Sequence, residues 1–111
     1  MVTTQATTLA QAQKWLAAAP EDKVFRCVNG EVYRTLQDME SGLLRMTDEH
    51  YTYHCNDVKH DFSTWVRDVF GDANLAEQLR MCHARPEAAR AVHDAIEKAS
   101  AVGKPLIKRR V

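Results

Sequence analysis

The apolar spacing within residues 61–70 constrains the fold more than any other feature of this sequence. The apolar side chains recur at intervals of three, one, three and one: Phe62, Trp65, Val66, Val69 and Phe70. That spacing is typical of a helix face packed against a core. Asp61 precedes the first apolar residue and Gly71 follows the last, and these residue types favour a helix start and a left-handed stop. A helix of about ten residues is not stable alone, so the stretch predicts a packed helical domain.

Signals for further helices lie on both sides of this stretch. Thr8 and Gln11 form a capping box before a helix that should run through residue 19. Its apolar face would consist of Leu9, Ala12, Trp15, Leu16 and Ala19. Other helix starts are expected at Thr35, Thr47, Asp72 and Arg85-Pro86. Gly42 would be a weak point inside the helix that follows Thr35.

A hairpin signal lies between the first two helices. Asn29-Gly30 separates two short apolar-rich runs, which is the strongest local signal for a β-hairpin. Together with the helix signals, it predicts a mainly α fold. We expect five or six short helices around one core, with a small hairpin near residues 24–34.

Length and composition indicate one domain without a membrane anchor. The 111 residues fit a single helical domain at residues 8–103, between a disordered N-terminus (residues 1–7) and a basic tail (residues 104–111). No apolar run approaches the roughly 18 residues of a membrane span, and the N-terminus lacks the features of a signal peptide. The three cysteines have no CxxC spacing and are expected to be reduced. These features predict a cytoplasmic protein that does not contact membranes.

The charges balance overall but are unevenly distributed. The chain has 15 basic and 15 acidic residues. Residues 35–61 carry six acidic and two basic residues, whereas the tail carries four basic residues and no acidic one. A nucleic-acid-binding domain should have a basic face, so we expect no nucleic acid partner. The tail residues Lys108, Arg109 and Arg110 are candidates for contact with a protein partner or with a second copy of the chain.

Three histidines and an aspartate form a candidate metal site. His50 and His54 are four residues apart and would share one helical face, and His60 and Asp61 follow after a short link. Imidazole and carboxylate ligands suit Zn²⁺ or Fe²⁺. In the structural alternative, His50 is a surface residue and His54 hydrogen-bonds the start of the following helix, including Asp61 itself. The sequence leaves both alternatives open.

The sequence contains no recognisable catalytic constellation. Cys55 and His54 are neighbours, so on a helix their side chains would point about 100° apart. The chain has no glycine-rich phosphate loop, no GxSxG elbow and no paired-carboxylate motif. We therefore expect a non-catalytic interaction or accessory module that needs no cofactor. A metal-binding domain that holds Zn or Fe is the alternative.

One extended pattern resembles a known family. The pattern consists of Tyr53-His54, Asp61-Phe62, Trp65, Asp68-Val69, Gly71-Asp72 and Leu75-Ala76, with Gly30 and Thr35-Leu36 upstream. It resembles a small prokaryotic helical domain family of unknown function, over roughly residues 24–83. The resemblance implies a compact helical domain without an established activity, sometimes appended to carbohydrate-active enzymes. His50, Cys55 and His60 lie outside the pattern, so the resemblance does not imply a metal site built from them.

Overall fold

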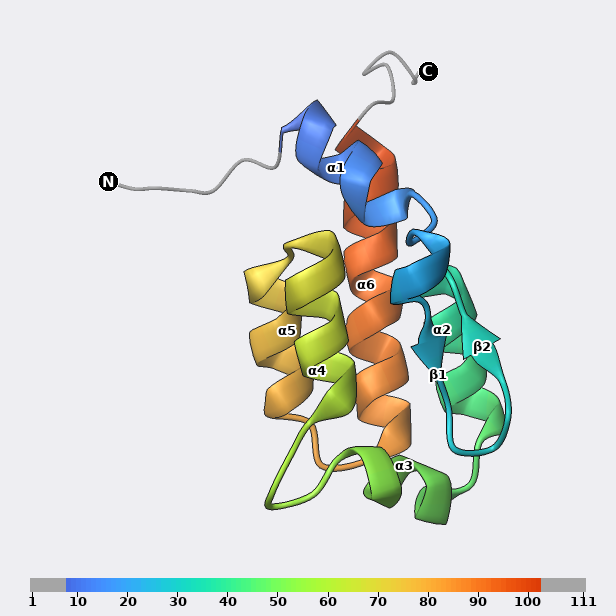
Figure 1. Cartoon of the computed structure of the whole chain (residues 1–111). Helices are drawn as coiled ribbons and strands as arrows, with labels where there is room; N and C mark the ends of the chain where they lie inside the picture. Colours follow the sequence, from blue (N-terminus) through green and yellow to red (C-terminus); the bar gives the residue numbers. More distant parts are fainter. Residues whose placement is uncertain (1–7, 103–111) are drawn as a thin grey trace.

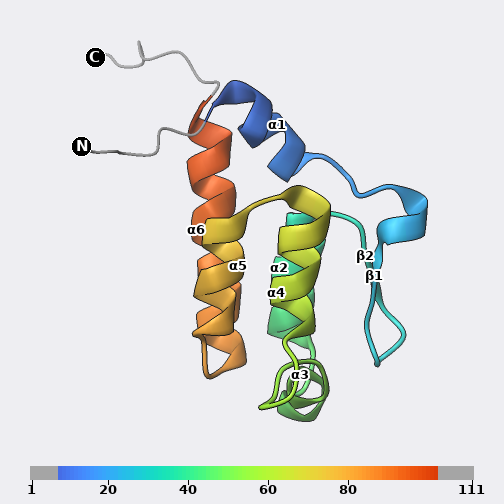
Figure 2. The ribbon, with the colours of Figure 1, turned by 60° about the vertical axis from the view of Figure 1, so that its left-hand side comes forward.

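Helix α6 (Arg85–Val102) runs along the whole fold, and the other helices pack around it (Figure 1). Helix α2 (Leu36–Arg45) lies against it on one side and α5 (Ala73–Arg80) on another. Helix α1 (Leu9–Leu16) crosses one end of the fold, and α3 (Asp48–His54) lies at the opposite end (Figures 1 and 2). The buried face of α6 consists mostly of small side chains: Ala88, Ala89, Val92, Ile96 and Ala99.

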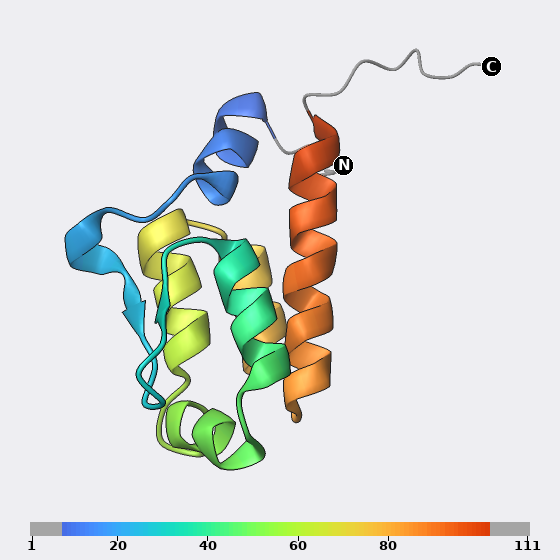
Figure 3. The same cartoon turned by 90° about the vertical axis from the view of Figure 1, so that its right-hand side faces the viewer.

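The computed structural model describes residues 8–102 and confirms the predicted fold class. Within these residues it contains six α-helices and one two-stranded antiparallel sheet. The remaining elements are α4 (Asp61–Trp65), β1 (Phe25–Arg26), β2 (Val32–Tyr33), the 3₁₀ turn η1 (Glu21–Lys23) and the π-helical turn η2 (Val66–Phe70). The hairpin lies outside α2 and α4, as seen in Figure 3. Within this part of the chain, each helix is too short or too polar to cross a bilayer.

Side-chain caps confirm the predicted helix starts, with one correction. Four predicted caps each accept a hydrogen bond from the backbone N–H three residues later: Thr8, Thr35, Thr47 and Asp72. Helix α4 differs from the prediction. Its N-cap is His60, whose Nδ1 accepts from the N–H of Ser63, and Asp61 is the first helical residue. The Asp61 carboxylate is turned toward His54 instead, which is why the histidine takes over the cap.

The predicted helix over residues 61–70 is formed by α4 and η2 together. Its last turn is π-helical, and Gly71 ends it with a φ of 73°. Four of its five apolar side chains are buried: Phe62, Trp65, Val66 and Phe70. Val69 is half-buried. The apolar face expected from the spacing is therefore the face that enters the core.

The core is built around stacked aromatic rings from the hairpin and α4. Phe25 of β1 pairs with Tyr33 of β2, and their ring centroids are 5.8 Å apart. The Phe25 ring also stacks on Phe62 at 4.8 Å and meets Trp65 at 5.7 Å. The indole N–H of Trp65 donates to the carbonyl of Lys23 at 2.7 Å. The hairpin is thus held to the helices by both packing and a partly buried hydrogen bond.

The predicted hairpin is confirmed, and its turn is wider than a two-residue Asn-Gly loop. The N–H of Gly30 donates to the carbonyl of Cys27 at 2.9 Å. Gly30 has a φ of 95°, whereas Asn29 does not have a positive φ. A type I′ turn would need positive φ at both residues. Asn29 contributes through its side-chain oxygen, which accepts from the N–H of Glu31 at 2.9 Å.

Gly42 of α2 allows the hairpin to pack directly on the helix. A Cβ atom at this position would overlap the ring and the hydroxyl of Tyr33. The Tyr33 side chain is fully buried, and its hydroxyl donates to Oε1 of Glu31 at 3.0 Å. The residue that weakens the helix in isolation is therefore required by the packing of the hairpin.

Candidate functional site

His54 joins three parts of the fold. It is buried at the end of α3. Its Nε2 accepts from the backbone N–H of Val28 in the hairpin turn at 3.0 Å, and its Nδ1 lies 2.9 Å from Oδ2 of Asp61. Because Nε2 is an acceptor, the ring proton sits on Nδ1 and is donated to Asp61. This is the contact that the structural alternative predicted for His54.

The Asp61 carboxylate is compensated inside the fold. Besides His54, its Oδ2 contacts the ammonium group of Lys59 at 3.0 Å. Partial burial alone would raise the pKa of Asp61, but the hydrogen bonds from His54 and Lys59 together hold it below its ordinary value. The carboxylate is therefore ionised near neutral pH, and its charge is already paired with a cation of this chain.

His60 and Cys55 form a second small cluster. Nδ1 of His60 accepts from the N–H of Ser63 at 3.2 Å and lies 3.5 Å from Sγ of Cys55. Burial lowers the pKa of His60, whose Nε2 has no hydrogen-bond partner among residues 8–102. Burial raises the pKa of Cys55 to about 12. Near neutral pH this pair lacks the thiolate that nucleophilic catalysis by cysteine requires.

The structure does not gather the four predicted ligands into one metal site. His50 caps its own helix, because its Nδ1 accepts from the N–H of Thr47 at 3.4 Å. Among residues 8–102, no three His, Cys, Asp or Glu side chains form a group that could hold a metal ion. Metal binding by His50, His54, His60 and Asp61 stays a prediction, and it would require His54 to give up the hydrogen bond at whichever ring nitrogen bound the ion.

The candidate interaction residues of the tail cannot be placed. Lys108, Arg109 and Arg110 lie outside the described residues. The contact that we predicted between this tail and a protein partner, or a second copy of the chain, therefore stays a prediction. So does the boundary between the helical domain and the tail.

His54 and His50 should differ sharply in their effect on stability. We expect His54→Ala to lower the free energy of unfolding by about 1–2 kcal/mol, because the N–H of Val28 and the Asp61 carboxylate lose their common partner. His50→Ala should change it by less than about 0.5 kcal/mol, because the one hydrogen bond that its ring makes with residues 8–102 is long and exposed to solvent. Urea denaturation of both variants measures the difference. Equal losses would contradict the structural role of His54.

His60 should make the fold sensitive to mild acid. Its pKa in the fold lies below the ordinary value of 6.5, so the unfolded chain binds the proton first as the pH falls. The stabilisation is complete above the unfolded pKa and is lost as the pH falls through the folded pKa. Asp61 acts in a lower window, because its pKa is lowered from 3.8.

The variant His60→Asn tests this pH dependence. Asparagine is a good helix cap but does not titrate, so the variant should lose less stability than the parent when the pH drops below 6.5. The measurement is the free energy of unfolding in urea at a series of pH values. An unchanged slope in this window would show that His60 is not the group responsible.

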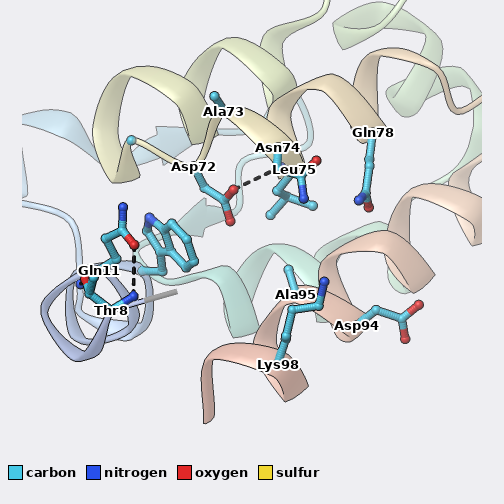
Figure 4. A pocket seen from close by; sticks show the side chains of 12 residues that line it. Thr8, Gln11, Asp72, Ala73, Asn74, Leu75, Gln78, Asp94, Ala95 and Lys98 are labelled. Carbon is cyan, nitrogen blue, oxygen red and sulfur yellow. Dashed lines mark hydrogen bonds between the residues drawn. The ribbon is translucent and has the colours of Figure 1, made fainter. Parts of the chain in front are cut away.

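A groove lies at the end of the fold where α1 crosses α5 and α6 (Figure 4). Its volume is about 850 Å³, within the ~300–1,000 Å³ that is usual for ligand sites. All three helices contribute polar side chains to it, including Gln11, Asn74, Gln78, Asp94 and Lys98. The sequence analysis did not find this groove, because it depends on how three helices from distant parts of the chain meet.

Asp72 is the buried charged group of the groove. Its side chain is 5% exposed, and Oδ1 accepts from the N–H of Leu75 at 3.0 Å. Figure 4 shows the carboxylate in the space between α5 and the other two helices. Among residues 8–102, no basic side chain lies within ion-pair distance of it, and no second hydrogen bond reaches it. The sequence predicted its capping role but not its position in a cavity.

Trp15 is the aromatic side chain of the groove. It is half-buried, although the sequence analysis assigned it to the packed face of α1. That face is only partly covered, since Ala12 is the one buried residue of α1 and Leu9 is 53% exposed.

The chain matches no known family model, curated protein or solved structure. The resemblance to a small helical domain family therefore stays a prediction. Several residues of the resembling pattern nevertheless have clear structural roles here. His54 binds Asp61, Trp65 fills the core and Asp72 caps α5.

Proposed function

We propose that the protein is a non-catalytic interaction module that binds a protein partner in the groove between α1, α5 and α6. The observation that carries this proposal is the presence of a half-buried indole, Trp15, and a buried carboxylate, Asp72, in one groove. Tryptophan in a partly desolvated setting with polar neighbours is typical of the residues that dominate binding energy in protein interfaces.

The chemistry of the groove supports binding rather than turnover. General acid–base or nucleophilic catalysis needs an activated group within hydrogen-bond reach of its activator. Of the residues that the structure describes, no histidine or cysteine lines the groove. Asp72 caps α5, and Asp94 pairs with Arg90 at 3.3 Å. The rings of four histidines elsewhere make hydrogen bonds within the fold: His50, His54, His60 and His93.

Site-specific photo-crosslinking tests the proposed function. A photoreactive amino acid in place of Gln78, an exposed residue of the groove, should capture a partner from native lysate. The matched control carries the same group in place of Glu49 on α3, at the opposite end of the fold (Figure 1). We expect the partner at position 78 only, and we expect it to be lost when Trp15→Ala is added.

Two outcomes would contradict the proposed function. Capture that survives Trp15→Ala, or that is equal at the control position on α3, would show that the groove is not the binding surface. Reproducible turnover of a small molecule by the pure protein would show that the protein is not a purely non-catalytic module.

A further inference from the structure

We infer that the groove recognises a basic side chain, lysine or arginine, in a segment of the partner protein. The charged group would meet the Asp72 carboxylate, and the aliphatic stem would lie on the Trp15 indole. This inference rests on the proposed function and adds the chemistry that the partner must present.

The Asp72 carboxylate is the first reason. A carboxylate has about four acceptor positions, and the described residues fill one of them, through the N–H of Leu75. Burial of a charge is costly unless hydrogen bonds or an opposite charge compensate it. The positive end of the α5 dipole offsets part of this cost. The acceptor positions that remain are suited to the N–H groups of an ammonium or guanidinium ion.

The Trp15 indole is the second reason. The face of an indole ring attracts cations through its quadrupole and repels anions. Lysine and arginine also carry long aliphatic stems that pack well on apolar surfaces. A carboxylate and an indole in one groove therefore favour a ligand group that is cationic at its tip and apolar along its stem. Basic side chains of proteins have this construction.

The other charges of the groove do not reverse this preference. Lys98 of α6 is exposed and makes no ion pair with a residue in the range 8–102, so water screens its charge. The Asp94 carboxylate, on the same helix, adds a negative charge that Arg90 partly balances. Lys14 lies close to Gly71 at the edge of the groove and is also exposed. The buried charge of Asp72 is the least screened of these, and it sets the preferred sign of the ligand.

The two tryptophans of the chain provide the measurement. Trp15 lines the groove, whereas the indole N–H of Trp65 is held by the Lys23 carbonyl in the core. Capped alanine-based hexapeptides with one arginine, with one glutamate or with neither are titrated into the intact ¹⁵N-labelled protein. We expect the arginine peptide to shift the Trp15 indole signal saturably, with the Trp65 signal unchanged. The other two peptides should leave both signals in place.

Three substitutions test how individual charges affect binding of the arginine peptide. Asp72→Asn keeps the helix cap and should weaken binding of the arginine peptide by about tenfold or more. Lys98→Gln removes a cation from the groove and should strengthen binding about two- to fivefold. Asp68→Asn, at an exposed carboxylate that pairs with Arg67 outside the groove, is the matched control and should leave binding unchanged.

The outcomes separate this inference from the proposed function. Tighter binding of the glutamate peptide, no binding of the arginine peptide, or undiminished binding by Asp72→Asn would overturn the inference. In each of these cases, capture of a partner by the photoreactive group at position 78 would leave the proposed function standing with a different ligand chemistry. Loss of that capture as well would overturn both.

Discussion

Trp65→Ala is expected to lower the free energy of unfolding by about 3–5 kcal/mol, a large share of the ~5–15 kcal/mol that stabilises a small domain. Trp65 is 8% exposed, and its ring meets Phe25 and Phe70 edge-on at 5.7 and 5.0 Å. Alanine would leave a cavity between α4 and the hairpin and would remove the hydrogen bond to the Lys23 carbonyl. The melting temperature should fall by more than about 10 °C.

Two further variants make this test specific. Trp65→Phe keeps an aromatic ring but loses the indole N–H, so its melting temperature should lie between those of the parent and the alanine variant. Val58→Ala removes a side chain that is 91% exposed and should have no measurable effect. A Trp65→Ala variant with the same melting temperature as the parent would contradict the position of Trp65 in the core.

Gly42→Ala is expected to destabilise the protein by about 3 kcal/mol, at the upper end for overpacked cores. Inside a helix, this substitution ordinarily stabilises by about 1 kcal/mol. The sign is reversed here because the new methyl group would occupy the position of the Tyr33 ring. The ring would have to leave a fully buried site and break its hydrogen bond to Glu31. Urea denaturation measures the change.

The Tyr33→Ala background is the control for this prediction. Without the ring, the methyl group at position 42 has room, so Gly42→Ala should regain its ordinary stabilising sign. The two substitutions should therefore be strongly non-additive, as expected for residues in contact. A Gly42→Ala variant that is stabilised in the parent protein would show that the hairpin does not pack on α2 as described.

Features set by neighbouring residues could be predicted from the sequence. The caps at Thr8, Thr47 and Asp72 depend on a side chain and a backbone N–H three residues later. The stop at Gly71 depends on its own left-handed conformation. These local interactions have the same geometry in any helical protein, which is why these helix starts and this stop were predicted correctly. The end of the first helix was not, because α1 ends at Leu16 and not at residue 19.

Features that depend on distant residues were predicted less well. His60 rather than Asp61 caps α4, because Asp61 is drawn to His54 of the preceding helix. Gly42 was assigned as a weak point from the low helix propensity of glycine. The sequence did not show that Tyr33, from another element, packs against it. A single sequence contains the local preferences of each residue but not the partner that a fold brings to it.

The candidate site also has one feature set by nearby residues and one set by distant residues. The pairing of His54 with Asp61 belonged to one of two alternatives derived from the sequence, and the two side chains are hydrogen-bonded in the structure. The groove was not foreseen, because it brings together Trp15, Asp72 and Lys98 from three helices. Two of these residues were assigned ordinary roles from the sequence, Trp15 as a core residue and Asp72 as a helix cap. The role that we propose for them in binding depends on their common position in the groove.

Amide chemical-shift mapping of the protein with its captured partner is the most direct test of the proposed function. We predict changes confined to α1, α5 and the second half of α6, with the Trp15 indole among the largest. The signals of residues around His54 and Asp61 should stay in place. Changes centred on His54, Asp61 and the hairpin turn, with the groove unaffected, would contradict the proposal that the groove is the binding surface.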